Sequence, residues 1–152
     1  MLKCISQMVE GNKTRLQWDE YFMSIALIAS CRSPCSRLHV GSVIVKSNRI
    51  VSMGYNGFIA GAPHTSHIRD GHEQATTHSE INALGNSNRL GGISLEGASI
   101  YITHYPCLNC FKSIASNGIK EIIYLNDYNN DSLVQIIAQE TDIVIRKLEL
   151  VE

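Results

Sequence analysis

The chain has 152 residues and a formal net charge of −1 at pH 7, with 44% hydrophobic and 18% charged residues. This length and composition predict one domain of ordinary size with a buried core, and they lack the signature of an intrinsically disordered chain. The near-neutral charge argues against a nucleic-acid-binding surface, which would present a basic face.

The sequence also carries signs of where the protein works. It has no run of about 18 apolar residues, and its first residues lack the continuous apolar stretch of a secretory signal. Five cysteines, an odd number, make a disulfide framework unfavourable. Cysteines held for metal in a reducing compartment are the better interpretation. We therefore expect a cytoplasmic protein with no membrane span.

The predicted elements begin after a polar N-terminal arm at residues 1–16. Apolar side chains recur at helical spacing over residues 18–30, which predicts a core-facing helix. Residues 40–45 and 50–55 are β-rich runs separated by Ser47-Asn48, a pattern typical of a hairpin. Residues 56–76 are rich in Gly, Pro, His and Ser and show no periodicity. Loops of this length in a compact domain are usually functional.

The second half of the chain alternates helices with strands. We expect helices over 77–90, 107–116 and 132–139, and strands over 99–103, 121–125 and 143–148. The resulting order, α-β-β-α-β-α-β-α-β, predicts an α/β fold. Its sheet would open with one hairpin, continue through crossover helices, and be covered on both faces. We expect residues 17–152 to form this single domain.

Two motifs have the composition of a metal site: His78-Ser79-Glu80 and Pro106-Cys107-Leu108-Asn109-Cys110. Zinc prefers imidazole and thiolate ligands, and a catalytic site leaves one of four positions open for water. Pro106 suits a helix start, which would place Cys107 and Cys110 on one face of the first turn. Free amides at that helix end favour thiolates. His78, Cys107 and Cys110 are therefore predicted ligands of a catalytic zinc.

Glu80 lies two residues after the histidine and is the candidate catalytic residue. Zinc lowers the pKa of a bound water towards about 7. The two motifs together resemble those of zinc-dependent nucleobase deaminases. By that resemblance, Glu80 would accept the water proton, pass it to a ring nitrogen of the substrate, and deliver a second proton to a departing amine. One carboxylate would then serve first as base and later as acid.

Simpler interpretations exist for each of these motifs. A Cys-x-x-Cys pair can be a redox pair or half of a closed structural zinc site. Thr77-x-x-Glu80 fits a capping box, in which Glu80 would bond back to the Thr77 amide. The combination of His78, Glu80 and the cysteine pair favours the catalytic interpretation over these alternatives.

The chain also resembles a known family. The matching stretches are Trp18-Asp-Glu-Tyr-Phe-Met, Arg37-x-x-Val-Gly-Ser-Val-Ile-Val, Gly54-Tyr-Asn-Gly-Phe, His78-Ser-Glu-Ile-Asn-Ala-Leu, Pro106-Cys-x-x-Cys and Ser116-Asn-Gly-Ile-Lys-Glu. The zinc motif alone is shared by zinc-dependent nucleobase deaminases in general. Together, the stretches resemble the deoxycytidylate (dCMP) deaminases, including the bacterial late-competence proteins of that type, from residue 18 to about 144.

The resemblance implies a fold, an activity and a regulation. The fold would be a three-layer α/β/α sandwich around a mixed five-stranded sheet, the cytidine deaminase-like fold. The activity would be hydrolysis of dCMP to dUMP and ammonia with Zn²⁺ as cofactor. Members of the family usually form homo-hexamers that are activated by dCTP with Mg²⁺ and inhibited by dTTP.

The same resemblance assigns substrate contacts to three residues. Asn56 would contact the nucleotide, Arg89 its phosphate, and Tyr128 would pack over the substrate. A planar guanidinium can hold a phosphate through two hydrogen bonds. Arg89 could instead be a solvated cation at a helix end, and Tyr128 an ordinary loop aromatic. Ser79 stands where alanine is more usual, and its small side chain predicts little effect.

A second metal is also implied, because some relatives carry a structural zinc near the long loop. Cys35 matches one ligand, His64 and His72 fall near later ligands, and His67 would complete four. Cys31 is a substitute ligand. The alternative is that these histidines are polar loop residues without a metal.

Other functions compete with dCMP deamination. The substrate could be dCTP, free deoxycytidine or a tRNA adenosine, although the charge disfavours RNA. The chain could also be a non-catalytic accessory module that senses nucleotides or takes part in DNA uptake. Glu80 and the open coordination position argue against such a module.

Overall fold

A mixed five-stranded sheet forms the centre of the protein, with strand order β2-β1-β7-β8-β9. The computed structural model describes residues 1–150, and its sheet consists of β1 (Gly41–Lys46), β2 (Arg49–Tyr55), β7 (Ser99–His104), β8 (Glu121–Asn126) and β9 (Val144–Lys147). β1 pairs antiparallel with both β2 and β7, whereas β7, β8 and β9 run parallel. The predicted α/β fold, with a hairpin followed by crossover connections, is confirmed.

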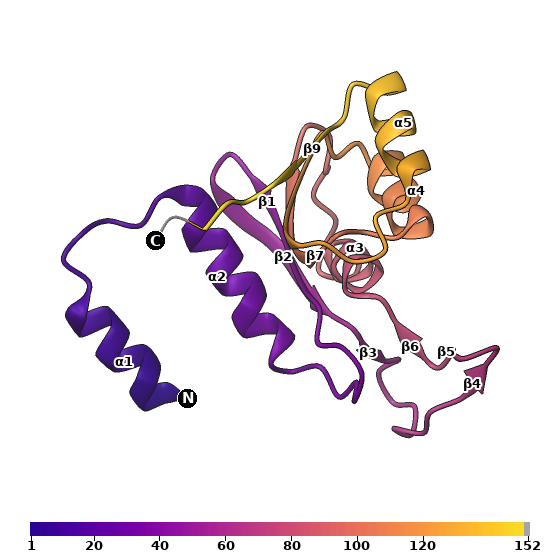
Figure 1. The fold of residues 1–152 in the computed structure, drawn as a ribbon, viewed down its shortest axis with the longest axis horizontal. Helices are drawn as coiled ribbons and strands as arrows, with labels where there is room; N and C mark the ends of the chain where they lie inside the picture. The colour runs from indigo at the N-terminus through magenta and orange to yellow at the C-terminus, as the bar shows by residue number, and fades with distance from the viewer. Residues whose placement is uncertain (151–152) are drawn as a thin grey trace.

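Helices cover both faces of this sheet, which gives three layers (Figure 1). One face packs against α2 (Trp18–Ser30), whose bounds agree with the prediction. The other face packs against α3 (Ser79–Arg89), α4 (Leu108–Ser116) and α5 (Ser132–Glu140).

Alternating apolar residues on the strands explain why both faces are covered. On β1, Val43 and Val45 join the buried cluster of α2, while Ile44 joins the cluster under α3, α4 and α5. On β7, Tyr101 faces α2 and Ile102 the opposite side. Successive side chains of a strand point to opposite faces, so apolar residues in sequence create two cores.

Two glycines let helices approach the sheet closely. A Cβ atom at Gly41 would lie 2.0 Å from the carbonyl oxygen of Ala26 in α2. A Cβ atom at Gly54 would lie 2.3 Å from the carbonyl oxygen of Ser79 and 2.5 Å from the amide nitrogen of Ala83. The first turn of α3 is therefore seated directly on β2.

The prediction that residues 56–76 form one loop without regular structure was wrong. This stretch contains two small ribbons, in which β3 (Gly57–Phe58) pairs with β6 (Thr76–Thr77) and β4 (Ile68–Arg69) with β5 (His72–Glu73). Strands of two residues are too short to show periodicity. The turn signal was present, because Asp70-Gly71 adopts positive φ angles at both positions, as a two-residue hairpin turn requires.

The prediction that α3 begins at Thr77 was also wrong. Thr77 belongs to β6, and His78 is the N-cap of α3. The capping box between Thr77 and Glu80 is not formed, because Thr77 pairs with Gly57 instead. Likewise, α4 begins one residue later than predicted, with Cys107 as its N-cap.

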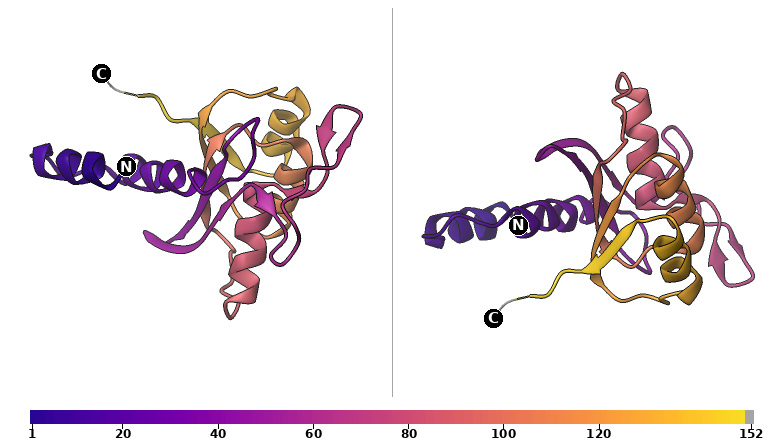
Figure 2. Two further views of the ribbon diagram at one scale, coloured as in Figure 1. Left: turned by 90° about the horizontal axis from the view of Figure 1, so that it is seen from below. Right: turned by 90° about the horizontal axis from the view of Figure 1, so that it is seen from above.

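The N-terminal residues form a helix, α1 (Leu2–Gly11), that has no buried residue. It lies apart from the sheet on the α2 side (Figures 1 and 2). That residues 17–152 make up a single domain stays a prediction. Within the described residues, none of the helices has the length and apolar composition needed to cross a membrane.

Candidate active site

Three predicted metal ligands meet where two helices begin. His78 is the N-cap of α3, Cys107 is the N-cap of α4, and Cys110 lies in the first turn of α4. The His78 Nδ1 atom lies 3.3 Å from Cys110 Sγ and 3.6 Å from Cys107 Sγ. Across residues 1–150, this is the one group of histidine, cysteine and acidic side chains gathered closely enough to hold a metal ion.

The spacing of this group fits zinc. Ligand distances of about 2.3 Å to sulfur and 2.0–2.1 Å to nitrogen, in tetrahedral geometry, place sulfur and nitrogen roughly 3.5 Å apart. The two observed sulfur–nitrogen distances bracket this value. His78 and Cys107 are exposed whereas Cys110 is buried, so the group is open to the surface on one side. Three ligands open to the surface suit a catalytic rather than a closed site.

The electrostatics of the group favour a thiolate at Cys107. Hydrogen bonds with Cys110 and His78 lower the pKa of the Cys107 thiol to about 4. The pKa of Cys110 is raised, first by its hydrogen bond to Cys107 and then by burial. A thiolate is the form of cysteine that binds metal, so the site already favours the required charge at Cys107.

Glu80 lies next to this group in the first turn of α3. Its side chain is 4% exposed, and burial raises the pKa of its carboxyl group. The charge of Glu80 helps to raise the pKa of the Cys110 thiol. The nearby charge of His78 partly offsets the effect of burial by lowering the pKa of Glu80. A buried carboxylate next to a metal group is arranged for proton transfer, and a raised carboxyl pKa is typical of such catalytic residues.

Hydrogen bonds to the sheet fix the position of α3. The hydroxyl of Ser42 on β1 donates to the carbonyl of Ser79 over 2.8 Å. On the edge strand β2, the Ser52 hydroxyl donates to the carbonyl of Ala83, while the side-chain amides of α3 donate to strand carbonyls: Asn82 to Tyr55 and Asn86 to Met53. The start of α3, and with it the metal group, is thus held in place by two strands.

The side chain of Asn56 forms two hydrogen bonds with the segment before β1. Its Oδ1 atom accepts from the Val40 amide and its Nδ2 atom donates to the Leu38 carbonyl, both over 2.8 Å. The side chain is buried. Asn56 therefore organises the segment before β1.

Arg89 and His78 lie at opposite ends of α3. Eleven residues separate them, which corresponds to an axial rise of roughly 16 Å. Figure 2 shows the C-terminal end of α3, in pink, projecting away from the sheet. Arg89 is exposed and lines a groove of about 510 Å³ together with Arg32, Tyr55 and Phe58. Thr77, the residue before His78, also lines this groove.

Tyr128 lies in the loop after β8 and is 45% exposed. Its ring meets that of His104, at the end of β7, in an edge-to-face contact with centroids 6.1 Å apart. His104 in turn contacts the Thr103 hydroxyl through Nδ1 at 2.9 Å. Tyr128 is therefore a neighbour of His104, which lies two residues before Pro106, a pairing that the sequence analysis missed.

The structure does not assemble the predicted second zinc site. His64 stacks on Phe58 with ring centroids 4.9 Å apart, while His67 directly precedes β4 and His72 is the first residue of β5 in the exposed ribbon. Neither Cys35 nor Cys31 forms a close group with them among the described residues. Short-range packing and strand pairing in the loop keep these side chains apart, so the second zinc is not supported.

The comparison with known protein families decides the classification. The profile described as the cytidine and deoxycytidylate deaminase zinc-binding region matches residues 16–126, which include both motifs of the metal group. The chain belongs to this deaminase family.

Individual relatives in the family agree with the profile. The chain is 38% identical over 142 residues to ComE operon protein 2 of Bacillus subtilis, covering 91% of this chain and 75% of the relative. It is 34% identical over 156 residues to the deoxycytidylate deaminase of Schizosaccharomyces pombe, covering 93% of this chain but 47% of the relative. The chain therefore spans about half the length of the yeast protein.

A solved structure supports the deaminase fold. The dCMP deaminase of cyanophage S-TIM5, in complex with dCMP and dUMP, matches with a TM-score of 0.77 and 31% identity. The match covers 89% of this chain and 99% of the phage chain. The cytidine deaminase-like, three-layer fold predicted from the sequence is therefore confirmed.

One contact within this deaminase site was missed by the sequence analysis. The hydroxyl of Ser79 donates to Glu80 Oε2 over 2.9 Å. The signal that could have revealed this contact was Ser79 itself, a serine between His78 and Glu80 where alanine is more usual. Its size suggested little effect, but its hydroxyl is directed at the carboxylate.

Proposed function

We propose that this chain catalyses the hydrolytic deamination of dCMP to dUMP and ammonia. The observation that carries the proposal is the cluster of His78, Cys107 and Cys110 beside the buried carboxylate of Glu80. Family membership and the match to a phage dCMP deaminase support the choice of reaction and substrate.

His78, Cys107 and Cys110 would hold the zinc ion. When bound there, zinc would supply the Lewis acidity that activates water at neutral pH. Glu80 accepts a proton from the attacking water and gives it to the ring nitrogen next to the reacting carbon. Glu80 then takes the second proton from the hydroxyl now bonded to that carbon and supplies it to the amine as the carbon–nitrogen bond breaks. One water is consumed, and the cytosine amine leaves as ammonia.

Substrate recognition is assigned to the residues carried over by resemblance. Arg89 would meet the substrate phosphate, and Tyr128 would pack over the substrate. The hydrogen bonds of Asn56 give it a further task in holding the loop before β1. The support for these assignments is the match of positions within the family.

Regulation and assembly extend the proposal. Activation by dCTP with Mg²⁺, inhibition by dTTP, assembly into a homo-hexamer, and a cytoplasmic location are supported by the family resemblance. Ammonia release from dCMP with and without each effector tests the regulation. The mass in solution, measured by light scattering, tests the assembly.

The direct test of the reaction is a comparison of substrates. Ammonia release should be measured with zinc-loaded protein on dCMP, dCTP, deoxycytidine and a stem-loop RNA. The proposal predicts the highest kcat/KM for dCMP. Preference for dCTP, deoxycytidine or RNA would identify a different deaminase. Nucleotide binding without ammonia release from any substrate would indicate a sensing module.

A further inference from the structure

Ser79 contributes a buried hydrogen bond to the proposed proton carrier. Its hydroxyl lies 2.9 Å from Glu80 Oε2, with Ser79 0% and Glu80 4% exposed. Two adjacent residues of a helix normally point in different directions, so this contact is not a consequence of helix geometry alone. It exists because both side chains are turned into the same buried space beside the metal group.

The Glu80 carboxylate has few other partners. Within residues 1–150, Ser79 is the one hydroxyl or amide side chain that bonds to it. Removal of this hydroxyl would leave the carboxylate oriented by its backbone and by the metal ligands around it.

Ser79 is itself held firmly. Its carbonyl accepts from the buried Ser42 hydroxyl on β1 over 2.8 Å. The backbone of Gly54 on β2 lies so close to the same carbonyl that a Cβ atom there would be 2.3 Å away. The hydroxyl therefore projects from a backbone position fixed by two strands, as expected of a group that orients another.

A hydroxyl is suited to a partner that changes its protonation. It can donate to a carboxylate and accept from a carboxylic acid, whereas an amide N–H can only donate. The same contact can therefore keep Glu80 in place before and after it takes up a proton.

We propose that Ser79 is a positioning residue, whose hydroxyl holds the Glu80 carboxylate in the orientation needed for proton transfer. The inference rests on the proposed deamination and adds to it a residue that acts through Glu80. It replaces the expectation from the sequence that a serine at this position has little effect.

The test compares Ser79→Ala with Ser87→Ala, zinc-loaded, on dCMP. Ser87 is a buried serine two turns further along α3, so its variant makes the same chemical change away from the carboxylate. Loss of a hydrogen bond to a charged group predicts a fall in kcat of about 10- to 100-fold for Ser79→Ala. The KM, zinc content and melting temperature should stay near wild type. Ser87→Ala should change none of these quantities.

A crystal structure of Ser79→Ala gives a second readout, independent of turnover. The proposal predicts that Glu80 leaves its wild-type rotamer or occupies more than one. Ser79→Cys, which keeps a weak donor, should show an intermediate kcat and serves as the test if Ser79→Ala fails to fold. A kcat within twofold of wild type, or an unchanged Glu80 rotamer, would overturn the positioning role. A wild-type chain that releases no ammonia from dCMP would contradict the proposed function instead.

Discussion

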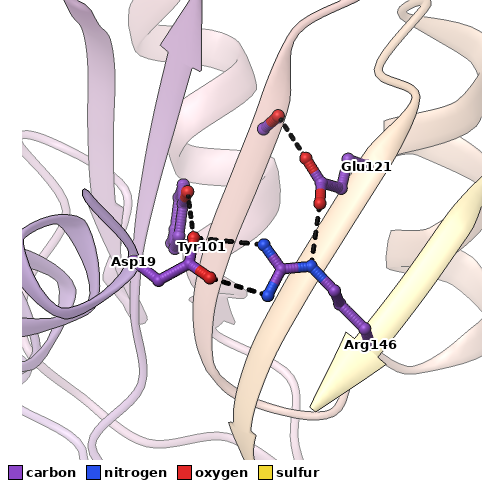
Figure 3. Close-up of polar contacts among 5 residues, drawn as sticks. Asp19, Tyr101, Glu121 and Arg146 are labelled. Atoms are coloured by element: carbon purple, nitrogen blue, oxygen red, sulfur yellow. Dashed lines mark hydrogen bonds and ion pairs between the residues drawn. The ribbon is translucent and has the colours of Figure 1, made fainter. Parts of the chain in front are cut away.

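Asp19 and Arg146 lie 127 residues apart in the sequence and form a two-pronged ion pair. Arg146 Nη1 donates to Asp19 Oδ2 over 2.8 Å, and Nη2 donates to Oδ1 over 3.1 Å (Figure 3). The Tyr101 hydroxyl also donates to Asp19, and Arg146 Nε donates to Glu121. This network joins the start of α2 to strands β7, β8 and β9, on the face away from the metal group.

We expect the Asp19 ion pair to make stability depend on pH. The hydrogen bond from Arg146 is the main cause that lowers the pKa of Asp19 in the folded protein. The stabilisation is therefore complete above the unfolded-state pKa of about 3.9 and is lost as the pH falls through the lower folded-state value. Because both side chains are about one-third exposed, Asp19→Asn should cost about 1 kcal/mol at pH 7.

Urea unfolding of wild type and Asp19→Asn at several pH values checks this. The difference in free energy of unfolding should be constant from pH 7 to about pH 5 and should shrink as the pH falls below about 4. A difference that stays the same at pH 7 and pH 3 would remove ionisation of Asp19 from the explanation.

A methyl group at Gly54 should disturb the start of α3. The added Cβ atom would overlap the backbone of Ser79 and Ala83, which cannot yield as a flexible side chain would. Gly54→Ala should therefore lower the free energy of unfolding by about 2 kcal/mol and weaken zinc binding. The matched control is Gly85→Ala. Gly85 lies in α3 itself, and a Cβ atom added there meets nothing within 4 Å.

In urea unfolding, Gly85→Ala should instead raise the free energy of unfolding by about 0.5–1 kcal/mol, because alanine favours helix. Zinc content after dialysis against a weak chelator measures the metal site in both variants. Equal effects of the two substitutions would show that close packing at Gly54 does not position α3.

Replacement of Arg89 should impair the reaction with the nucleotide dCMP but not the reaction with the nucleoside deoxycytidine. If Arg89 binds the substrate phosphate, Arg89→Ala should raise KM for dCMP by roughly 10- to 150-fold, because this factor corresponds to the free energy of one hydrogen bond to a charged group. Turnover of deoxycytidine, which lacks the phosphate, should be unchanged. Steady-state kinetics on both substrates measures this, and equal losses would place phosphate recognition elsewhere.

Removal of zinc should abolish activity without unfolding the chain. The two buried clusters on either side of the sheet contain none of the proposed ligands. Chelated protein should therefore keep its circular dichroism spectrum and a cooperative melting transition, at a somewhat lower temperature. Ammonia release should return when zinc is added back. Complete unfolding on chelation would instead indicate a structural metal site.

Local patterns were sufficient to predict most of the fold. The residues around Ile44 and Ile102 are apolar without a break, which indicates a strand buried on both faces. Helical spacing from Trp18 to Ser30 predicted α2 with its observed bounds. The spacing of Cys107 and Cys110 and their position at a helix start likewise depend on neighbouring residues alone. These features were therefore within reach of the sequence.

The errors arose where structure depends on contacts between distant or very short segments. Thr77 was assigned to a helix because its hydroxyl suits a cap, but pairing with Gly57 places it in β6. His64 and His72 were matched to a second zinc site by resemblance to relatives, while their positions follow from packing on Phe58 and from pairing in the β4–β5 ribbon. The pairing of Thr77 with Gly57 and the packing of His64 on Phe58 are not contained in any local pattern, whereas the Asp70-Gly71 turn of the β4–β5 ribbon was.

The most direct test of the account is the replacement of Glu80 by glutamine. The amide keeps the size of the side chain but cannot carry the proton, and it leaves His78, Cys107 and Cys110 unchanged. We predict that Glu80→Gln retains one zinc per chain and loses nearly all ammonia release from dCMP. A variant that binds zinc and keeps more than a tenth of the wild-type kcat would contradict the role of Glu80 and the proposed chemistry.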